Sequence, residues 1–191
     1  VTVFSLVVVT SLSLMNQGTT ASIRSLQITL VRQEIDAQVE ALRFLNASYV
    51  TAYYSGYAPT ERSPAQQYYL ISSKTKTDYN NGTRSVTQFA NGGSETCQAA
   101  PQGSFILDTQ KAGYYAYSAA NFPAATTFSQ VEHRNNAAPI ARGMWIEAVR
   151  SVVTGATAYT DFHVRACWYP PGASGRAMNL GTIVRLYEPT Y

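Results

Sequence analysis

The opening segment of this chain is most notable for what it lacks. No charged residue occurs before Arg24, no proline occurs before Pro59, and Gly18 is the single glycine of the rod-like stretch. Residues 1–15 are strongly apolar, and a helix-compatible pattern continues to about Tyr54. An apolar rod that runs on as a water-compatible rod suits a chain that first sits in a membrane and later packs against its own copies.

Charge is scarce along the whole chain. Charged residues make up 13% of the 191 residues, about half the usual share, with three lysines against eleven arginines. The hydrophobic share of 46% excludes a disordered chain. A net charge of +3 is too small to indicate nucleic-acid binding. The 14 tyrosines suit an extracellular surface that interacts through rings and hydroxyls.

Groups that perform chemistry are equally few. His133 and His163 are the only histidines, and neither lies beside a cluster of carboxylates that could complete a metal site. There is no Gly-x-Ser-x-Gly elbow and no phosphate-binding glycine motif. Residues 78–82 read as a turn, because the spacing and closing glutamate of a calcium loop are missing. We therefore expect no catalytic residue, no cofactor and no metal, and hence no enzyme.

Cys97 and Cys167 are the only cysteines, and their spacing matches no zinc or redox motif. In an exported chain the simplest outcome is one disulfide, whereas the alternative is two buried thiols. A bridge would close a loop of about 70 residues, worth on the order of 4 kcal/mol in the chain-entropy model.

The amphipathic half of the rod shows one apolar stripe at helical spacing. Its members are Ile28, Val31, Ile35, Val39, Leu42, Leu45 and Tyr49. A helix over residues 1–53 would be about 80 Å long, whereas a head of about 137 residues has a radius of gyration of about 14 Å. The N-terminal half must therefore project. We assign residues 1–23 to an apolar assembly or membrane part, residues 24–54 to an amphipathic part, and residues 55–191 to a β-rich globular head.

The head changes to short alternating runs separated by turns. Asn81-Gly82 between residues 68–77 and 83–89 predicts a hairpin. Further strands are expected at 104–107, 113–117, 143–153, 159–168 and 180–188, with a long loop at 119–142. In 159–168 the alternation places Phe162, Val164, Ala166 and Trp168 toward the core, and Asp161, His163, Arg165 and Cys167 away from it. The predicted fold class is α+β, with a long projecting N-terminal helix whose second half packs on an antiparallel sheet.

The run Val3-Phe4-Ser5-Leu6-Val7-Val8-Val9 resembles the N-terminal segment of the type IV pilin and pseudopilin superfamily, in which an Ile-Phe-Ala-Leu-like run lies within the apolar stretch. The family's cleavage glycine and acidic start are not in the printed sequence, and we expect them upstream of Val1. The resemblance implies a helix that is half buried in a sheet and half projecting. It also implies assembly with copies of the chain through the apolar helix.

Two sets of helix residues carry this expectation. The side chains expected to pack in a filament core are Val3, Phe4, Leu6, Val7, Val8, Leu12 and Leu14. The segment Asn16-Gln17-Gly18-Thr19 contains poor or middling helix formers, so we expect a kink there or local unwinding when subunits pack.

The resemblance implies a structural subunit of a type IV pilus-like homopolymer, a fimbrium of the bacterial cell surface that serves adhesion or motility. Its expected partners are copies of itself in a helical filament, the inner membrane before assembly, and the pilus assembly machinery. Two alternatives remain open. One is a minor pilin or a type II secretion pseudopilin. The other is a membrane-anchored extracellular binding domain or enzyme that acts alone.

Overall fold

The computed structural model describes residues 2–56, 58, 60–78, 96–135, 137–151, 157–172 and 175–189, with side chains except at 2–9, 12, 73–78 and 151. The described chain forms two helices and seven strands. They are α1 (Thr2–Tyr54), α2 (Pro64–Asp78), β1 (Phe105–Asp108), β2 (Gly113–Ala116), β3 (Gln130–Glu132), β4 (Ile140–Arg142), β5 (Met144–Ser151), β6 (Tyr159–Trp168) and β7 (Met178–Tyr187).

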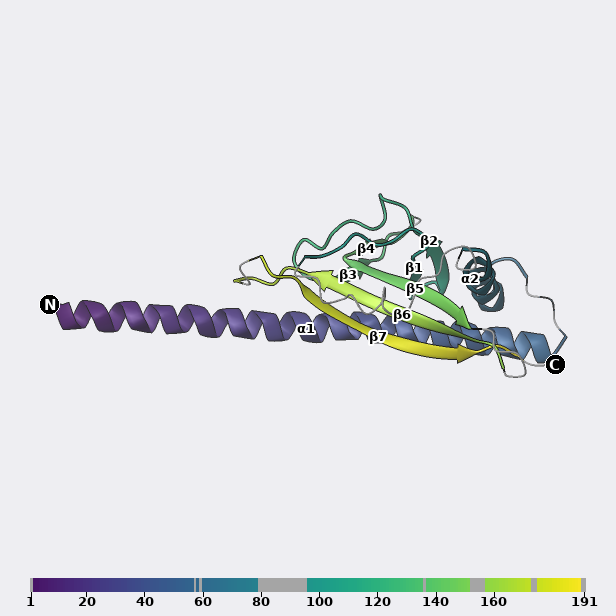
Figure 1. The fold of residues 1–191 in the computed structure, drawn as a ribbon, viewed down its shortest axis with the longest axis horizontal. Coiled ribbons are helices and arrows are strands. Elements are labelled where there is room, and N and C mark those ends of the chain that lie inside the picture. The colour runs from purple at the N-terminus through teal and green to yellow at the C-terminus, as the bar shows by residue number, and fades with distance from the viewer. Residues whose placement is uncertain are drawn as a thin grey trace.

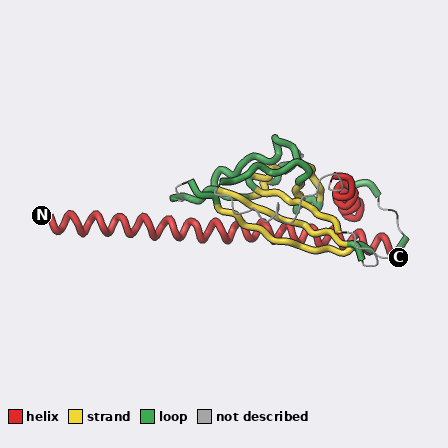
Figure 2. The backbone as a smooth tube through the Cα atoms, viewed as in Figure 1, coloured by secondary structure: helices red, strands yellow, loops and turns green. Residues whose placement is uncertain are grey.

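The fold is α+β, as the sequence predicts. Five antiparallel strands form a sheet in the order β2-β1-β5-β6-β7, and β3 and β4 form a separate antiparallel pair. Figure 1 shows the sheet lying along the C-terminal half of α1, with β7 nearest the helix and α2 at the far end of the head. The N-terminal half of α1 projects alone, as the tube in Figure 2 makes plain.

The core lies between α1 and the sheet. Five members of the predicted stripe are buried, namely Val31, Ile35, Val39, Leu42 and Leu45, and Ile28 and Tyr49 pack against them. The alternation expected in β6 is confirmed, because Phe162, Val164, Ala166 and Trp168 are all buried. Cys167 points to the opposite face yet is only 1% exposed, so that face is covered at this position.

The strand expected over residues 68–77 is wrong, because these residues belong to α2. Ser63 caps this helix, with its Oγ accepting the N–H of Gln66 at 3.2 Å, and Pro64 occupies the first helical position. Tyr68 and Ile71, three residues apart, bury one face of α2 in the core. Aromatic and β-branched residues generally favour strands. Here the N-terminal cap and the three-residue spacing of the buried side chains favour a helix instead. The rest of the predicted Asn81-Gly82 hairpin lies outside the described residues.

The segment 119–142, expected to be a loop, contains β3 and β4, in which Val131 pairs with Ala141. Each strand has only three residues, too few to show an alternating pattern in the sequence. The pair is held close to the main sheet at Gly143, the residue that joins β4 to β5. Cys167 N donates to Gly143 O at 2.8 Å, and Gly143 N donates to Pro123 O at 2.9 Å.

Candidate assembly surface

The part of α1 that leaves the head comprises residues 2–19. Every side chain described from Thr10 to Thr19 is exposed, and contact with the head begins at Thr20 and Arg24. Of the predicted filament-core residues, Leu14 is described and is 68% exposed. The side chains of the others, Val3, Phe4, Leu6, Val7, Val8 and Leu12, lie outside the described set.

The expected kink at Asn16-Gln17-Gly18-Thr19 is absent from the single chain, because α1 is helical throughout this segment. The hydroxyls of Thr19 and Thr20 both donate to Asn16 O, at 3.0 and 2.8 Å. These bonds satisfy the side chains locally without a break in the helix. Unwinding when subunits pack is a property of the assembled state and stays a prediction.

The surface of α1 that faces away from the head is divided into two faces. At 100° per residue, Met15, Leu26 and Phe44 lie within about 20° of one line along the helix. Their side chains are 68%, 59% and 53% exposed. Arg32, Asp36 and Arg43 are exposed on a separate charged face, about 90° away around the helix. Gln33 and Glu40 are exposed on the line itself, between Leu26 and Phe44, and Glu40 pairs with Arg43. We call the line of Met15, Leu26 and Phe44 the bare apolar face, because the head does not cover it.

Two buried glutamines fix α1 to the head. Gln38 is fully buried; its Nε2 donates to Leu107 O at 2.9 Å, and its Oε1 accepts Leu107 N–H at 3.0 Å. Three turns earlier, Gln27 Oε1 accepts the indole N–H of Trp168 at 3.2 Å. Polar residues inside an apolar stripe gave no signal of this role in the sequence. The amide of Gln38 continues the hydrogen bonding of β1 at the helix, which fixes the helix in both rotation and height.

Replacing Gln38 with leucine should destabilise the head by about 2–4 kcal/mol. The substitution leaves the N–H and C=O of Leu107 buried without partners, and each such group costs about 1–3 kcal/mol. Urea denaturation followed by circular dichroism measures the change. Gln33→Leu, an exposed position on the same helix, is the matched control and should shift stability by less than about 0.5 kcal/mol. Equal effects of the two variants would contradict this role of Gln38.

A second polar junction joins α1, β1 and the segment after β3. Asp108 is fully buried, and its Oδ1 lies 2.9 Å from His133 Nδ1. On the other side of the ring, Nε2 lies 3.3 Å from Thr109 Oγ1. This order of carboxylate, imidazole and hydroxyl was not foreseen from the sequence. The next two amides, of Gln110 and Lys111, donate to the side chain and carbonyl of Asp108, so neither is left to stabilise an oxyanion.

Glu34 of α1 lies against the same junction. Burial raises the pKa of Glu34 above its usual 4.5, and the nearby His133 and the N–H of Val131 offset part of that rise. Because the folded-state pKa is the higher one, the stability that Glu34 contributes is complete below about pH 4.5 and is lost as the pH rises through the folded value.

The wild-type protein should therefore lose stability relative to Glu34→Gln as the pH is raised from 4.5 toward neutrality. Urea midpoints measured across this range give the difference. Glu61→Gln, which removes an exposed carboxylate, controls for the change in net charge. If the urea midpoints of wild type and Glu34→Gln change with pH in parallel, this contribution of Glu34 to stability is contradicted.

The predicted disulfide is confirmed. Cys97 and Cys167 are bonded, with their Cα atoms 5.5 Å apart, and the backbone N–H of Cys97 donates to Tyr169 Oη at 2.9 Å. The bridge fastens the segment before β1 to the end of β6, on the outer face of the sheet. Its loop spans 70 residues and includes β1 through β6.

The double variant Cys97→Ala/Cys167→Ala should lower the free energy of unfolding by about 4 kcal/mol, because the unfolded chain regains the entropy of a 70-residue loop. Denaturation in urea measures the loss, and a larger m-value is expected from the more open unfolded state. An unchanged midpoint would show that the cross-link contributes nothing.

Among the described residues, no group of three or more histidine, cysteine or carboxylate side chains could hold a metal ion. In the same part of the chain, no helix combines the length and hydropathy needed to cross a membrane. His163 lies on the outer face of β6, where burial lowers its pKa, Arg165 lowers it further, and Asp161 opposes the shift.

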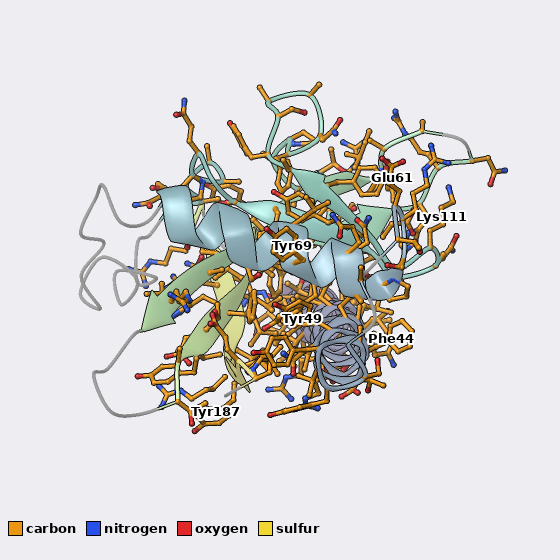
Figure 3. All side chains as sticks on the ribbon, turned by 90° about the vertical axis from the view of Figure 1, so that its right-hand side faces the viewer. Phe44, Tyr49, Glu61, Tyr69, Lys111 and Tyr187 are labelled. Carbon is orange, nitrogen blue, oxygen red and sulfur yellow. A yellow bond between two sulfur atoms is a disulfide. The ribbon has the colours of Figure 1, made fainter. Side chains whose placement is uncertain are left out.

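Tyrosines line a pocket of about 340 Å³ where α1 turns into α2. Figure 3 looks onto this end of the molecule, with Tyr69 on α2 and Tyr49 on α1. The wall consists of tyrosine, alanine and glutamine side chains and one glycine, and carries no charge. Its members are Tyr49, Ala52, Tyr53, Gly56, Ala58, Gln66 and Tyr69.

Comparison with known proteins finds no family model, no curated protein and no solved structure that matches this chain.

Proposed function

We propose that the chain is a structural subunit of a type IV pilus-like extracellular filament, assembled through α1. The observation that carries the proposal is the bare apolar face, which continues from the projecting segment past the point where the head begins. A helix that packs one side on its own head and leaves large apolar side chains uncovered on the other side has an arrangement suited to a bundle. The pilin-like order of a long helix followed by an antiparallel sheet agrees with this assignment.

The free energy of assembly requires apolar side chains along the whole projecting part of α1. A fully buried large apolar side chain contributes about 1.5–3 kcal/mol. Leu14, Met15, Leu26 and Phe44 are 53–68% exposed, so covering all four yields roughly 4–8 kcal/mol. Association costs an estimated 4–15 kcal/mol. The described residues therefore only begin to offset that cost, and the apolar residues before Leu12 must supply the rest.

A reconstruction of fibres from cells that produce the chain tests the proposal. The expected density has α1 helices packed against one another along the axis and heads on the outside, with the precursor held in the inner membrane before assembly. Helices that do not touch one another would overturn the assignment. A minor pilin or secretion pseudopilin differs only in abundance, which quantitative mass spectrometry of purified fibres measures.

The tyrosine-lined pocket favours a second candidate of another class, a membrane-anchored extracellular binding domain. Its volume of about 340 Å³ lies within the usual range for small-molecule sites. This candidate predicts a chain that stays monomeric in detergent and binds an uncharged ligand, with binding lost in Tyr69→Ala. The filament proposal instead predicts self-association that is indifferent to Tyr69.

A further inference from the structure

The described residues of the connection between β6 and β7 lie at the edge of the head, on the side of the projecting segment (Figure 1). Arg24 Nε donates to Pro171 O at 3.1 Å. Gly172 has a φ of +67° and lies so close to the helix that a Cβ there would be 3.0 Å from Thr20 Cγ2. This turn therefore rests directly on α1 and forms the upper wall of a hollow beside the helix.

The hollow has a volume of about 640 Å³, and five of its seven lining residues have polar side chains. Hydroxyl and amide side chains and one guanidinium line it, and no carboxylate does so; the polar set comprises Ser13, Asn16, Gln17, Thr20 and Arg24. These residues follow one another at steps of one, three and four, so they share one side of the helix. The head covers the same side of the helix further along, at Val31, Ile35 and Leu42.

Arg24 has no carboxylate partner within the residues that the structure describes. Other arginines of the head differ: Arg142 pairs with Glu132, and Arg185 contacts both carboxylate oxygens of Asp161 at 2.8 Å. A guanidinium held by Nε to a carbonyl, beside a hollow without acidic groups, is arranged to receive an anion.

We propose that this hollow holds the phosphodiester of a phospholipid headgroup while the chain resides in the membrane before assembly. The proposal rests on the proposed function for that membrane stage. Arg24 is the first charge after 23 uncharged residues, which span about 35 Å of helix. A charge is costly inside the hydrocarbon core of a bilayer, so an α1 inserted as far as its first charge holds Arg24 at the level of the headgroups. Phosphate oxygens match the planar fork of a guanidinium.

Lipid retention by the full chain in dodecyl maltoside micelles, read by native mass spectrometry, tests this site. The probes are phosphatidylglycerol and a galactosyl diacylglycerol with the same acyl chains, which has no phosphate. We expect phosphatidylglycerol to be retained by the wild type and by Arg32→Gln, which alters the separate charged face of α1. Arg24→Gln should weaken retention tenfold or more, and Arg24→Lys should be intermediate, because lysine keeps the charge without the fork. The galactolipid should bind weakly to all four proteins.

Several results would overturn the proposal. If Arg24→Gln and wild type retain phosphatidylglycerol equally, with unchanged thermal midpoints, the guanidinium does not contribute to lipid binding. Glycerol phosphate bound as tightly as phosphatidylglycerol would assign the hollow to a soluble phosphate. Loss of self-association in Arg24→Gln with lipid retention intact would assign Arg24 to a contact between copies. Retention is read on single chains, so it can fail while fibres form, and fibres can fail while retention holds.

Discussion

Filaments should be absent when Leu14 and Met15 are both replaced by aspartate, while the head remains folded. Both side chains are 68% exposed in the single chain, so the substitutions touch no packed contact of the head. In a bundle the same positions would be covered, and an unpaired carboxylate in an apolar setting costs several kcal/mol. Two such charges per subunit exceed the roughly 4–8 kcal/mol that the four described apolar side chains contribute.

Pelleting of sheared fibres and electron microscopy measure this loss, and circular dichroism of the detergent-solubilised subunit reports on the head. The matched control is Ser118→Asp/Ala119→Asp, which adds the same two charges at adjacent exposed positions of the head. It should leave fibre yield within about twofold of wild type. A normal yield from the helix variant would show that this part of α1 lies outside the polymer contacts.

Gly143→Ala should destabilise the head by roughly 5 kcal/mol, close to the total stability of a marginal domain. Gly143 has a φ of +61°, and an added Cβ would lie 2.4 Å from Cys167 O and 2.8 Å from the Ala125 side chain. Relief requires the backbone of β6 to move, which breaks the hydrogen bond from Cys167 N and the bond from Ser129 Oγ to Gly143 O. Backbone strain, overpacking and the lost hydrogen bonds each lower the free energy of unfolding.

Gly175→Ala separates the two causes. Gly175 has a φ of +80° with nothing within 4 Å of its added Cβ, so its cost is backbone strain alone, about 1 kcal/mol. Urea denaturation compares the variants, and the soluble yield reports on Gly143→Ala if it does not fold. Similar losses at both positions would mean that the close approach at Gly143 carries no energy.

Long periodic patterns were read correctly from the sequence. The stripe from Ile28 to Tyr49 repeats over six turns, and the alternation in 159–168 covers ten residues, so each signal is longer than local noise. The strands near 143–153 and 180–188 were found for the same reason, as β5 and β7, and residues 152–153 lie outside the described residues. The bond between Cys97 and Cys167 followed from there being only two cysteines.

Short or polar features were not predictable in the same way. Residues 68–77 have a composition that suits strands, and the helix cap at Ser63 and Pro64 was not part of the prediction. The roles of Gln27 and Gln38 depend on Trp168 and Leu107, which are far away in the sequence. The kink or unwinding expected at Gly18 and its neighbours concerns packed subunits and stays a prediction; in the single chain, the helix on both sides keeps this segment helical.

The enclosure of Cys167 has a consequence for the order of maturation. Its side chain is 1% exposed once β6 is in place, so an oxidising enzyme could not reach this thiol in a finished head. Bond formation must therefore accompany folding, before the outer segment closes over the sheet. Cys97 is only partly buried, so in the folded head a reductant approaches the bond from the Cys97 side.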